Sequence, residues 1–170
     1  KNIPYLGLCL GMQIMVIEYS RNILNINDAN SSEFDQNSKN HVIDFLPGQI
    51  KLKETGASMR LGNYPCVINK NSKVFNCYNS TEITERHRHR YEVNNNYRED
   101  LEKNGLIASG TSPDGNLVEI MEVDSHPFMI GSQFHPEFLS RPDRPHPLFY
   151  GFVSAVNETV VEGDQIRLIQ

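Results

Sequence analysis

The chain has 170 residues, the length of one domain rather than two, and 38% of them are apolar, which is enough for a sizeable core. Its formal net charge is −5, from 16 Lys and Arg against 21 Asp and Glu, and this argues against a general nucleic-acid-binding protein, which needs a basic surplus. The three cysteines cannot all pair in disulfides, so we expect a reducing, cytoplasmic location, and no apolar run reaches the roughly 18 residues that cross a membrane.

The first segment is an uncharged run over residues 2–17 that follows Lys1. One interpretation is a secretory signal, because a basic start before an apolar stretch is its usual pattern. Against it, a proline and two glycines interrupt the run, and no small-residue cleavage site follows. The other interpretation is a buried strand over residues 3–8 and a helix over residues 11–24, in which apolar side chains recur at steps of three and four. We favour the second.

The junction of this strand and helix is Gly7-Leu8-Cys9-Leu10-Gly11, a glycine-x-nucleophile-x-glycine pattern with cysteine in the central position. A nucleophile on such a turn has a strained backbone, and side chains at the two glycine positions would collide with the strand and the helix. The start of the helix directs N–H groups at the sulfur, which favours the reactive thiolate and can stabilise an oxyanion. The alternative is a small buried cysteine without chemistry.

An arginine and histidine run follows in the middle of the chain, on an expected strand over residues 83–92. Successive side chains of a strand point to opposite faces. One face therefore carries three arginines (Arg86, Arg88 and Arg90) and the other carries His87 and His89. Like charges so close repel one another unless an anion lies among them, which favours anion binding. A solvated basic surface is the alternative.

Three other features are interpreted as structural. Cys66 and Cys77 lack the spacing of metal ligands, so we expect no metal site. Residues 112–115 predict a hairpin turn between two strands. Glu119 and Glu122 lie in an expected alternating strand over residues 117–123 and are interpreted as its solvated face.

The candidate base is His135, in the segment Gln-Phe-His-Pro-Glu over residues 133–137. We expect a strand over residues 128–134, so this histidine lies at a carboxyl end, where ligands bind in open α/β sheets. Pro136 favours an extended backbone before it, which places Glu137 on the same side and in reach of the imidazole. The alternative is a surface histidine in a proline turn. Together with the cysteine elbow, the segment favours a Cys-His-Glu triad.

These two motifs resemble those of the class I (triad) glutamine amidotransferases. In that family the cysteine attacks the side-chain amide of glutamine, ammonia leaves from a glutamyl thioester, and water releases glutamate. The resemblance implies Cys9 as nucleophile, His135 as general acid and base, and Glu137 as the residue that orients the imidazole. Three further stretches resemble the CTP synthase branch of the family, namely residues 27–34, 59–62 and 85–94.

The resemblance also implies a pocket for L-glutamine. Arg90, with Tyr91 beside it, would pair with the α-carboxylate, a task that suits the forked guanidinium group. Glu33 would bind the substrate ammonium group. The side-chain end of the pocket would be formed by residues at the start of the first helix, namely Leu10, Gly11, Met12 and Gln13.

The fold class implied by the resemblance is α/β, with an open, mixed, flavodoxin-like sheet. Further strands are expected near residues 42–45, 49–53, 64–68 and 105–110, and a last helix over residues 147–157. We expect residues 1–156 to be part of an amidotransferase domain whose first βα units are missing from this chain. Residues 157–170 would be a C-terminal tail.

The function implied by the resemblance is the glutaminase step of a CTP synthase, which supplies ammonia for the ATP-dependent amination of UTP. The chain itself would hold no cofactor. An upstream synthetase domain would bind ATP and Mg²⁺, GTP would be an allosteric activator, and the whole enzyme would be a homotetramer. The alternatives are an incomplete, non-catalytic docking or regulatory module, and the amidotransferase domain of another glutamine-dependent ligase such as GMP synthase.

Overall fold

The computed structural model describes residues 2–45 and 59–159, which contain two β-sheets. The strands are β1 (Tyr5–Leu8), β2 (Ala29–Ser31), β3 (Asn40–Phe45), β4 (Arg60–Ile68), β5 (Glu82–His89), β6 (Tyr91–Val93), β7 (Leu106–Thr111), β8 (Val118–Val123) and β9 (Met129–Ser132). The larger sheet has the order β1-β9-β8-β7-β4-β5, and the smaller sheet has the order β2-β3-β6. In the larger sheet β1 and β9 are parallel, and the other neighbouring strands are antiparallel, so the expected mixed sheet is confirmed.

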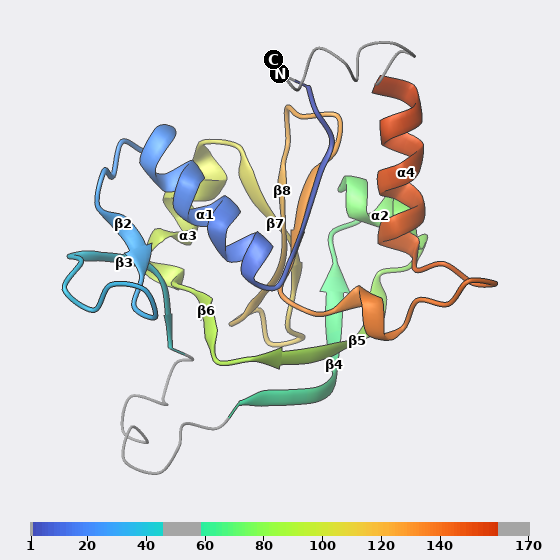
Figure 1. Ribbon diagram of the computed structural model, residues 1–170, viewed down its shortest axis with the longest axis horizontal. Helices are drawn as coiled ribbons and strands as arrows, with labels where there is room; N and C mark the ends of the chain where they lie inside the picture. Colours follow the sequence, from blue (N-terminus) through green and yellow to red (C-terminus); the bar gives the residue numbers. More distant parts are fainter. Residues whose placement is uncertain (1, 46–58, 160–170) are drawn as a thin grey trace.

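The helices are α1 (Leu10–Asn22), α2 (Lys73–Tyr78), α3 (Asn95–Lys103), α4 (Pro147–Thr159) and the 3₁₀ helix η2 (Pro136–Phe138). As Figure 1 shows, α1 and α3 cover one face of the larger sheet, and α2 and α4 cover the other. Each face has its own apolar core, and the neighbouring residues Ile120 and Met121 of β8 belong to opposite cores, as strand geometry requires. None of the described helices has the length and apolarity needed to cross a membrane.

The first segment forms the expected strand and helix. β1 pairs in parallel with β9 from Tyr5 opposite Met129 to Leu8 opposite Ser132. The buried side chains of α1, among them Met12 and Met15, belong to the core between this helix and the sheet. This packing argues against the signal-peptide interpretation, since the run is an integral part of the fold.

The expected strand over residues 83–92 is wrong as a single element. The chain bends at Arg90, so that β5 pairs with β4 in the larger sheet, while β6 pairs with β3 in the smaller one. The expected strand near 64–68 is longer, and the last helix extends to Thr159. The strand expected near 49–53 lies outside the described residues. Sequence reasoning missed β2, the short helix α2 and the polar helix α3.

The interpretation of Glu119 and Glu122 as a solvated face is also wrong. Every residue of β8 is buried, because this strand lies between β9 and β7 and is covered by apolar side chains on both faces. Glu122 accepts hydrogen bonds from the N–H groups of Lys73 (3.0 Å) and Val74 (3.2 Å), and so caps α2.

Candidate active site

Cys9 occupies the turn between β1 and α1 with φ 48° and ψ −101°, a backbone conformation that non-glycine residues rarely adopt. Its N–H donates to the carbonyl of Ser132 (2.7 Å), and its carbonyl accepts from the N–H of Gln13 (3.2 Å). These bonds hold the turn to β9 on one side and to the first turn of α1 on the other. The strained elbow expected from the sequence is confirmed, and strain of this kind is concentrated at functional sites.

The two glycines that flank Cys9 differ in why they are needed. A Cβ atom at Gly7 would lie 2.7 Å from the carbonyl carbon of Gly11, which no ordinary side chain tolerates. A Cβ atom at Gly11 would meet only the hydroxyl of Tyr5, at 3.6 Å, which is normal van der Waals contact. The expected collision is therefore confirmed at the first glycine and wrong at the second.

The thiol of Cys9 does not favour the thiolate form as expected. Burial raises its pKa above the ordinary value, and the carboxylates of Glu92 and Glu137 act in the same direction. The backbone N–H of Leu10 and the side chain of Gln133, whose Nε2 lies 3.6 Å from the sulfur, lower the pKa by less. Since the resting group is a thiol, nucleophilic chemistry here requires a base.

Cys9 comes after the carboxyl end of β1, and His135 comes after the carboxyl end of β9. Because these two strands are adjacent and parallel, both residues lie at the same edge of the sheet. Nδ1 of His135 lies 2.7 Å from Oε1 of Glu137, which confirms the expected contact. The expected extended backbone is not what brings the two side chains together, because Glu137 lies in the 3₁₀ helix η2. A carboxylate acceptor at Nδ1 leaves Nε2 as the nitrogen without a proton in the neutral ring.

Nε2 of His135 is shielded from solvent and has no hydrogen-bond partner among the described residues. The backbone N–H of His135 donates to the carbonyl of Arg86 on β5, at 2.8 Å. Within the part of the chain that the structure describes, no hydrogen bond joins this imidazole to the sulfur of Cys9. The nitrogen that would act as a base is thus available.

A cavity of about 240 Å³ opens beside the sulfur of Cys9. It is lined by most of the residues that the resemblance assigned to glutamine, namely Leu10, Gln13, Glu33, Arg90 and Tyr91. The amide Nε2 of Gln13 donates to the carbonyl of Tyr91 (3.0 Å) and to Oε1 of Gln133 (3.3 Å), so this side chain is held in place. Sequence reasoning missed three further lining residues, Met59, Arg88 and His89.

Gly11 and Met12 are not among the residues that line this cavity. The side chain of Met12 is fully buried in the core and packs closely on Gly131, where a Cβ atom would lie 2.6 Å from its Cγ. Met12 has no exposed surface to offer a ligand, and the assignment of both residues to glutamine stays a prediction.

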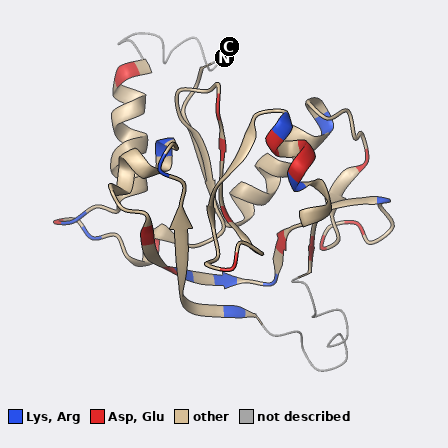
Figure 2. Ribbon diagram, turned by 180° about the vertical axis from the view of Figure 1, so that it is seen from behind, with Lys and Arg blue, Asp and Glu red and all other residues tan. Residues whose placement is uncertain are grey.

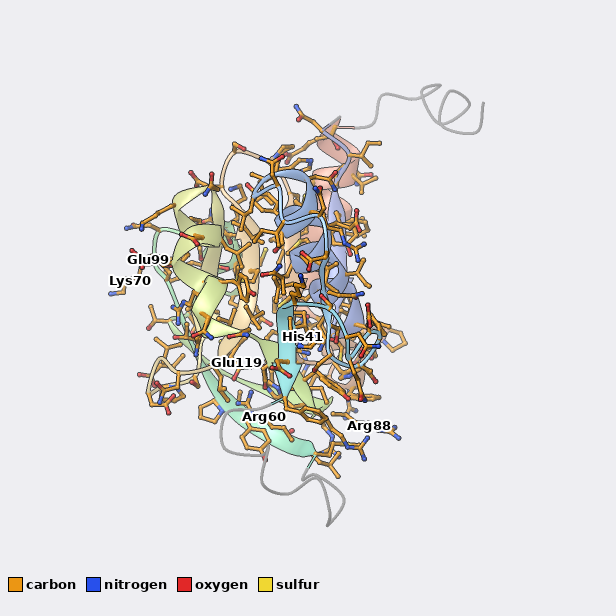
Figure 3. All side chains as sticks on the ribbon, turned by 90° about the vertical axis from the view of Figure 1, so that its left-hand side faces the viewer. His41, Arg60, Lys70, Arg88, Glu99 and Glu119 are labelled. Carbon is orange, nitrogen blue, oxygen red and sulfur yellow. The ribbon has the colours of Figure 1, made fainter. Side chains whose placement is uncertain are left out.

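The arginine and histidine run alternates as expected. Arg86, Arg88 and Arg90 are exposed, and His87 and His89 are buried. Arginines lie along β5 in Figure 2, and Figure 3 shows Arg88 extending outward from the molecule. The outer face is therefore a basic surface beside the cavity, and the histidines belong to the interior.

A buried polar cluster lies behind the cavity wall. Nε2 of His89 lies 2.6 Å from Oε1 of Glu92, and the guanidinium of Arg60 lies 3.4 Å from the same oxygen and 2.6 Å from Oε1 of Glu119. Figure 3 shows Arg60 and Glu119 of this cluster near each other. Burial raises the pKa of Glu119 to about 7, against the opposing effect of Arg60, and burial beside Arg60 lowers the pKa of His87 to about 2.

The remaining cysteines take no part in this site. Cys66 and Cys77 are free thiols, and burial raises the pKa of Cys77 to about 11. Across residues 2–45 and 59–159, no group of three or more His, Cys, Asp or Glu side chains could hold a metal ion.

Comparisons with known proteins agree with this arrangement. The sequence profile of the family "Glutamine amidotransferase class-I" matches residues 1–155. The CTP synthase of Dehalococcoides mccartyi is 57% identical over 168 residues, which are 99% of this chain and 31% of that protein. The CTP synthase of Rubrobacter xylanophilus is 60% identical over 152 residues, 89% of this chain and 27% of that protein. The chain therefore spans less than a third of the length of these curated relatives.

Among solved structures, the glutaminase domain of Trypanosoma brucei CTPS with bound acivicin superimposes with a TM-score of 0.87 and 42% sequence identity. The match covers 94% of this chain and 62% of that one. With a family profile over nearly the whole chain and close relatives of one kind, the chain belongs to the class I glutamine amidotransferases and is homologous to the glutaminase portion of the CTP synthases.

Proposed function

We propose that the chain hydrolyses L-glutamine as the glutaminase part of a CTP synthase. The observation that carries the proposal is the position of Cys9, on a strained elbow at the edge of a cavity, beside the strand end that bears His135 and Glu137. A nucleophile, a base with a free nitrogen and a carboxylate that orients the base are the parts that acyl transfer through a covalent intermediate needs.

Glutamine would bind by the two charges of its amino-acid end. Arg90 supplies a bidentate cation for the α-carboxylate, and Glu33 an anion for the ammonium group. Both line the cavity together with Tyr91, whose pKa is raised by burial and by Glu33 and is lowered by Arg90. The substrate amide would then lie toward Cys9 and Leu10.

Catalysis would begin when Nε2 of His135 takes the proton of the Cys9 thiol and the sulfur attacks the amide carbon of glutamine. Backbone N–H groups at the start of α1 would stabilise the oxyanion. His135 would return the proton to the leaving nitrogen, and ammonia and a glutamyl thioester would result. A water molecule, deprotonated by the same imidazole, would release glutamate and regenerate the thiol. Glu137 would keep the proton on Nδ1 and stabilise the imidazolium.

The activity of the whole protein is a further part of the proposal. By homology with the CTP synthases, the ammonia would be used by an upstream synthetase domain that aminates UTP with ATP and Mg²⁺. Activation by GTP, a homotetrameric state and a cytoplasmic location remain predictions. The assignment of residues 1–156 to the domain and of residues 157–170 to a tail is likewise a prediction, and residues 157–159 lie in α4.

One observation favours a second candidate, a non-catalytic docking or regulatory module. The match covers only 62% of the T. brucei glutaminase chain. If segments outside this chain complete the active site, the chain alone would not hydrolyse glutamine. A measurement of glutamate release separates the two candidates.

The test is glutamate release by the 170-residue chain and by a chimera in which the preceding part of the D. mccartyi CTP synthase is joined to it. We expect the chimera to hydrolyse glutamine and its Cys9→Ala variant to lose at least about 10⁴-fold in kcat. Cys77→Ala is the matched control and should retain activity. The Cys9→Ala chimera should still form CTP from UTP, ATP and ammonium chloride. Absence of glutamate release from an otherwise ammonia-competent chimera would refute the glutaminase proposal and favour the docking module.

A further inference from the structure

The loop between β9 and α4, residues 133–146, carries both His135 and Glu137 and is attached to β5 at two points. Near its start, the N–H of His135 donates to the carbonyl of Arg86 (2.8 Å). At its end, the imidazole of His146 lies 2.9 Å from the carboxylate of Glu85. Two adjacent residues of one strand thus hold both ends of the loop.

The protons of the second attachment follow from its hydrogen bonds. The backbone N–H of Leu148 donates to Nδ1 of His146 (3.3 Å), so the proton of the neutral ring is on Nε2, which donates to Oε1 of Glu85. The hydroxyl of Tyr78 donates to the same oxygen at 2.8 Å. Burial beside Glu85 raises the pKa of Tyr78 far above its ordinary value, so its hydroxyl remains a donor. One carboxylate oxygen therefore receives two donors from two different elements.

This cluster is costly to bury. Glu85 is 3% exposed and His146 is 4% exposed, and the second oxygen of Glu85 has no hydrogen-bond partner in the described part of the chain. Apolar side chains of similar volume would fill such a site at a lower cost in stability. What they would lack is direction, because hydrogen bonds, unlike apolar contacts, require a defined geometry between donor and acceptor.

The strand geometry connects this cluster to the base. Glu85 points inward from β5 and Arg86 points outward, while the backbone carbonyl of Arg86 accepts the N–H of His135. Any shift of β5 at Glu85 therefore moves the atom that holds the backbone of His135. A misplacement of about 1 Å in such a group can cost roughly 10²-fold in rate.

We propose that Glu85, Tyr78 and His146 are positioning residues that hold His135 in place for the hydrolysis of glutamine, an inference that rests on the proposed function. None of the three lines the cavity beside Cys9, and they act by fixing β5 against both ends of the loop that bears the base.

The experiment compares Glu85→Ala, Glu85→Gln and Tyr78→Phe in the chimera, with Glu82→Ala and Tyr150→Phe as matched controls at exposed positions on β5 and α4. We expect Glu85→Ala to lower kcat by about 10–100-fold with KM changed less than about twofold. Glu85→Gln keeps an oxygen that accepts both donors and should restore most of the activity. Tyr78→Phe, which removes one donor, should lower kcat by about 3–10-fold.

A double substitution separates positioning from general loss of structure. In a His135→Ala background, Glu85→Ala should cause no further loss of kcat, because its effect passes through the imidazole. Equal losses in both backgrounds, or a Glu85→Ala enzyme as active as Glu82→Ala, would overturn the inference. If Glu85→Ala does not fold, the same comparison is made with Tyr78→Phe.

A second measurement needs no turnover, so that the inference and the proposed function can fail separately. The imidazole resonances of His135 in ¹H–¹⁵N spectra should shift in Glu85→Ala and stay unchanged in Glu82→Ala. Unchanged resonances in both variants overturn the inference even where glutamine is hydrolysed. Shifted resonances in a chimera that releases no glutamate leave the positioning of His135 supported and the proposed function refuted.

Discussion

Two of the imidazole–carboxylate pairs in the described residues, His135 with Glu137 and His146 with Glu85, hold their protons in opposite ways. In the first, Nδ1 of His135 donates to Glu137 at 2.7 Å, and Nε2 has no partner in the described residues. In the second, Nε2 of His146 donates to Glu85 at 2.9 Å, and Nδ1 accepts the N–H of Leu148. The carboxylate sets the tautomer in both, and only the first ring keeps a nitrogen free to take a proton.

The two pairs also differ in how far their side chains are exposed to solvent. The side chains of the first pair are 19% and 42% exposed, and the pair follows the carboxyl end of β9. Those of the second are each 3% exposed, and the pair lies between β5 and α4. An acid and a histidine in contact are therefore not a sufficient sign of catalysis. Between these two pairs, an unused second nitrogen and a greater exposed fraction distinguish the candidate base from the structural pair.

The largest effect should come from removing the free nitrogen. We expect His135→Ala to lower kcat for glutamine hydrolysis by about 10⁴-fold, because the proposed base for the Cys9 thiol is lost. The free energy of unfolding should change by less than about 1 kcal/mol, since the ring is partly exposed and its Nε2 makes no bond in the described residues. Steady-state glutamate release and urea unfolding measure the two quantities. A His126→Ala variant, changed at a histidine far from the cavity lining, is the control.

Changing the acid of the first pair should have the next largest effect. We expect Glu137→Gln to lower kcat by about 10²–10⁴-fold, because an amide no longer favours the proton on Nδ1 or stabilises the imidazolium. The KM for glutamine should change little, since Glu137 is not part of the cavity lining. Glu82→Gln is the control on an exposed carboxylate. A Glu137→Gln enzyme that kept more than about a tenth of the activity would show that the contact has no catalytic use.

The second pair should respond mainly in stability. We expect His146→Ala to lower the free energy of unfolding by about 2–4 kcal/mol, because it leaves the buried carboxylate of Glu85 with one donor fewer. The loss of kcat should stay near that of Glu85→Ala and far below that of His135→Ala. Urea unfolding with an unchanged m-value is the measurement. Equal stability losses in the two histidine variants would remove the distinction between the pairs.

The smallest effect concerns the pH at which Cys9 reacts. Burial raises the pKa of this thiol, so its rate of alkylation by iodoacetamide should rise about tenfold per pH unit between pH 7 and pH 9, without a plateau. A plateau below pH 8 would instead indicate a preformed thiolate–imidazolium pair. Because the folded state holds this proton more tightly than the unfolded chain, the stability it contributes is complete below the ordinary thiol pKa and is lost as pH rises through the raised value.

The local parts of the site were open to prediction from the sequence. The elbow at Cys9 depends on a period change and a glycine two residues before it, and the contact of His135 with Glu137 spans two residues. The alternation of exposed arginines and buried histidines likewise follows from the geometry of a single strand. Contacts between residues close in sequence decide all three features, so a short segment of sequence is enough to predict them.

Other features could not be obtained in this way. The bend at Arg90 separates two strands because β6 pairs with β3, a partner distant in sequence. An alternating strand with two glutamates predicts one face exposed to solvent. Glu119 and Glu122 are nevertheless buried, because β8 lies between two strands and between two apolar cores. The resting state of the Cys9 thiol depends on burial and on carboxylates from other segments, which the helix start alone does not reveal.

The sequence by itself determined the type of chemistry in this protein: a cysteine on a tight turn, a histidine at a strand end and an acid two residues later. The tertiary structure alone decided which ring of the two pairs, His135 or His146, keeps a nitrogen without a partner in the described residues. The ring of His146 meets its carboxylate across 61 residues, and that of His135 across two. Hydrogen-bond partners brought together by the packing of β5, the loop and α4 fix the proton in each ring, and no local pattern of residue types specifies which partners those will be.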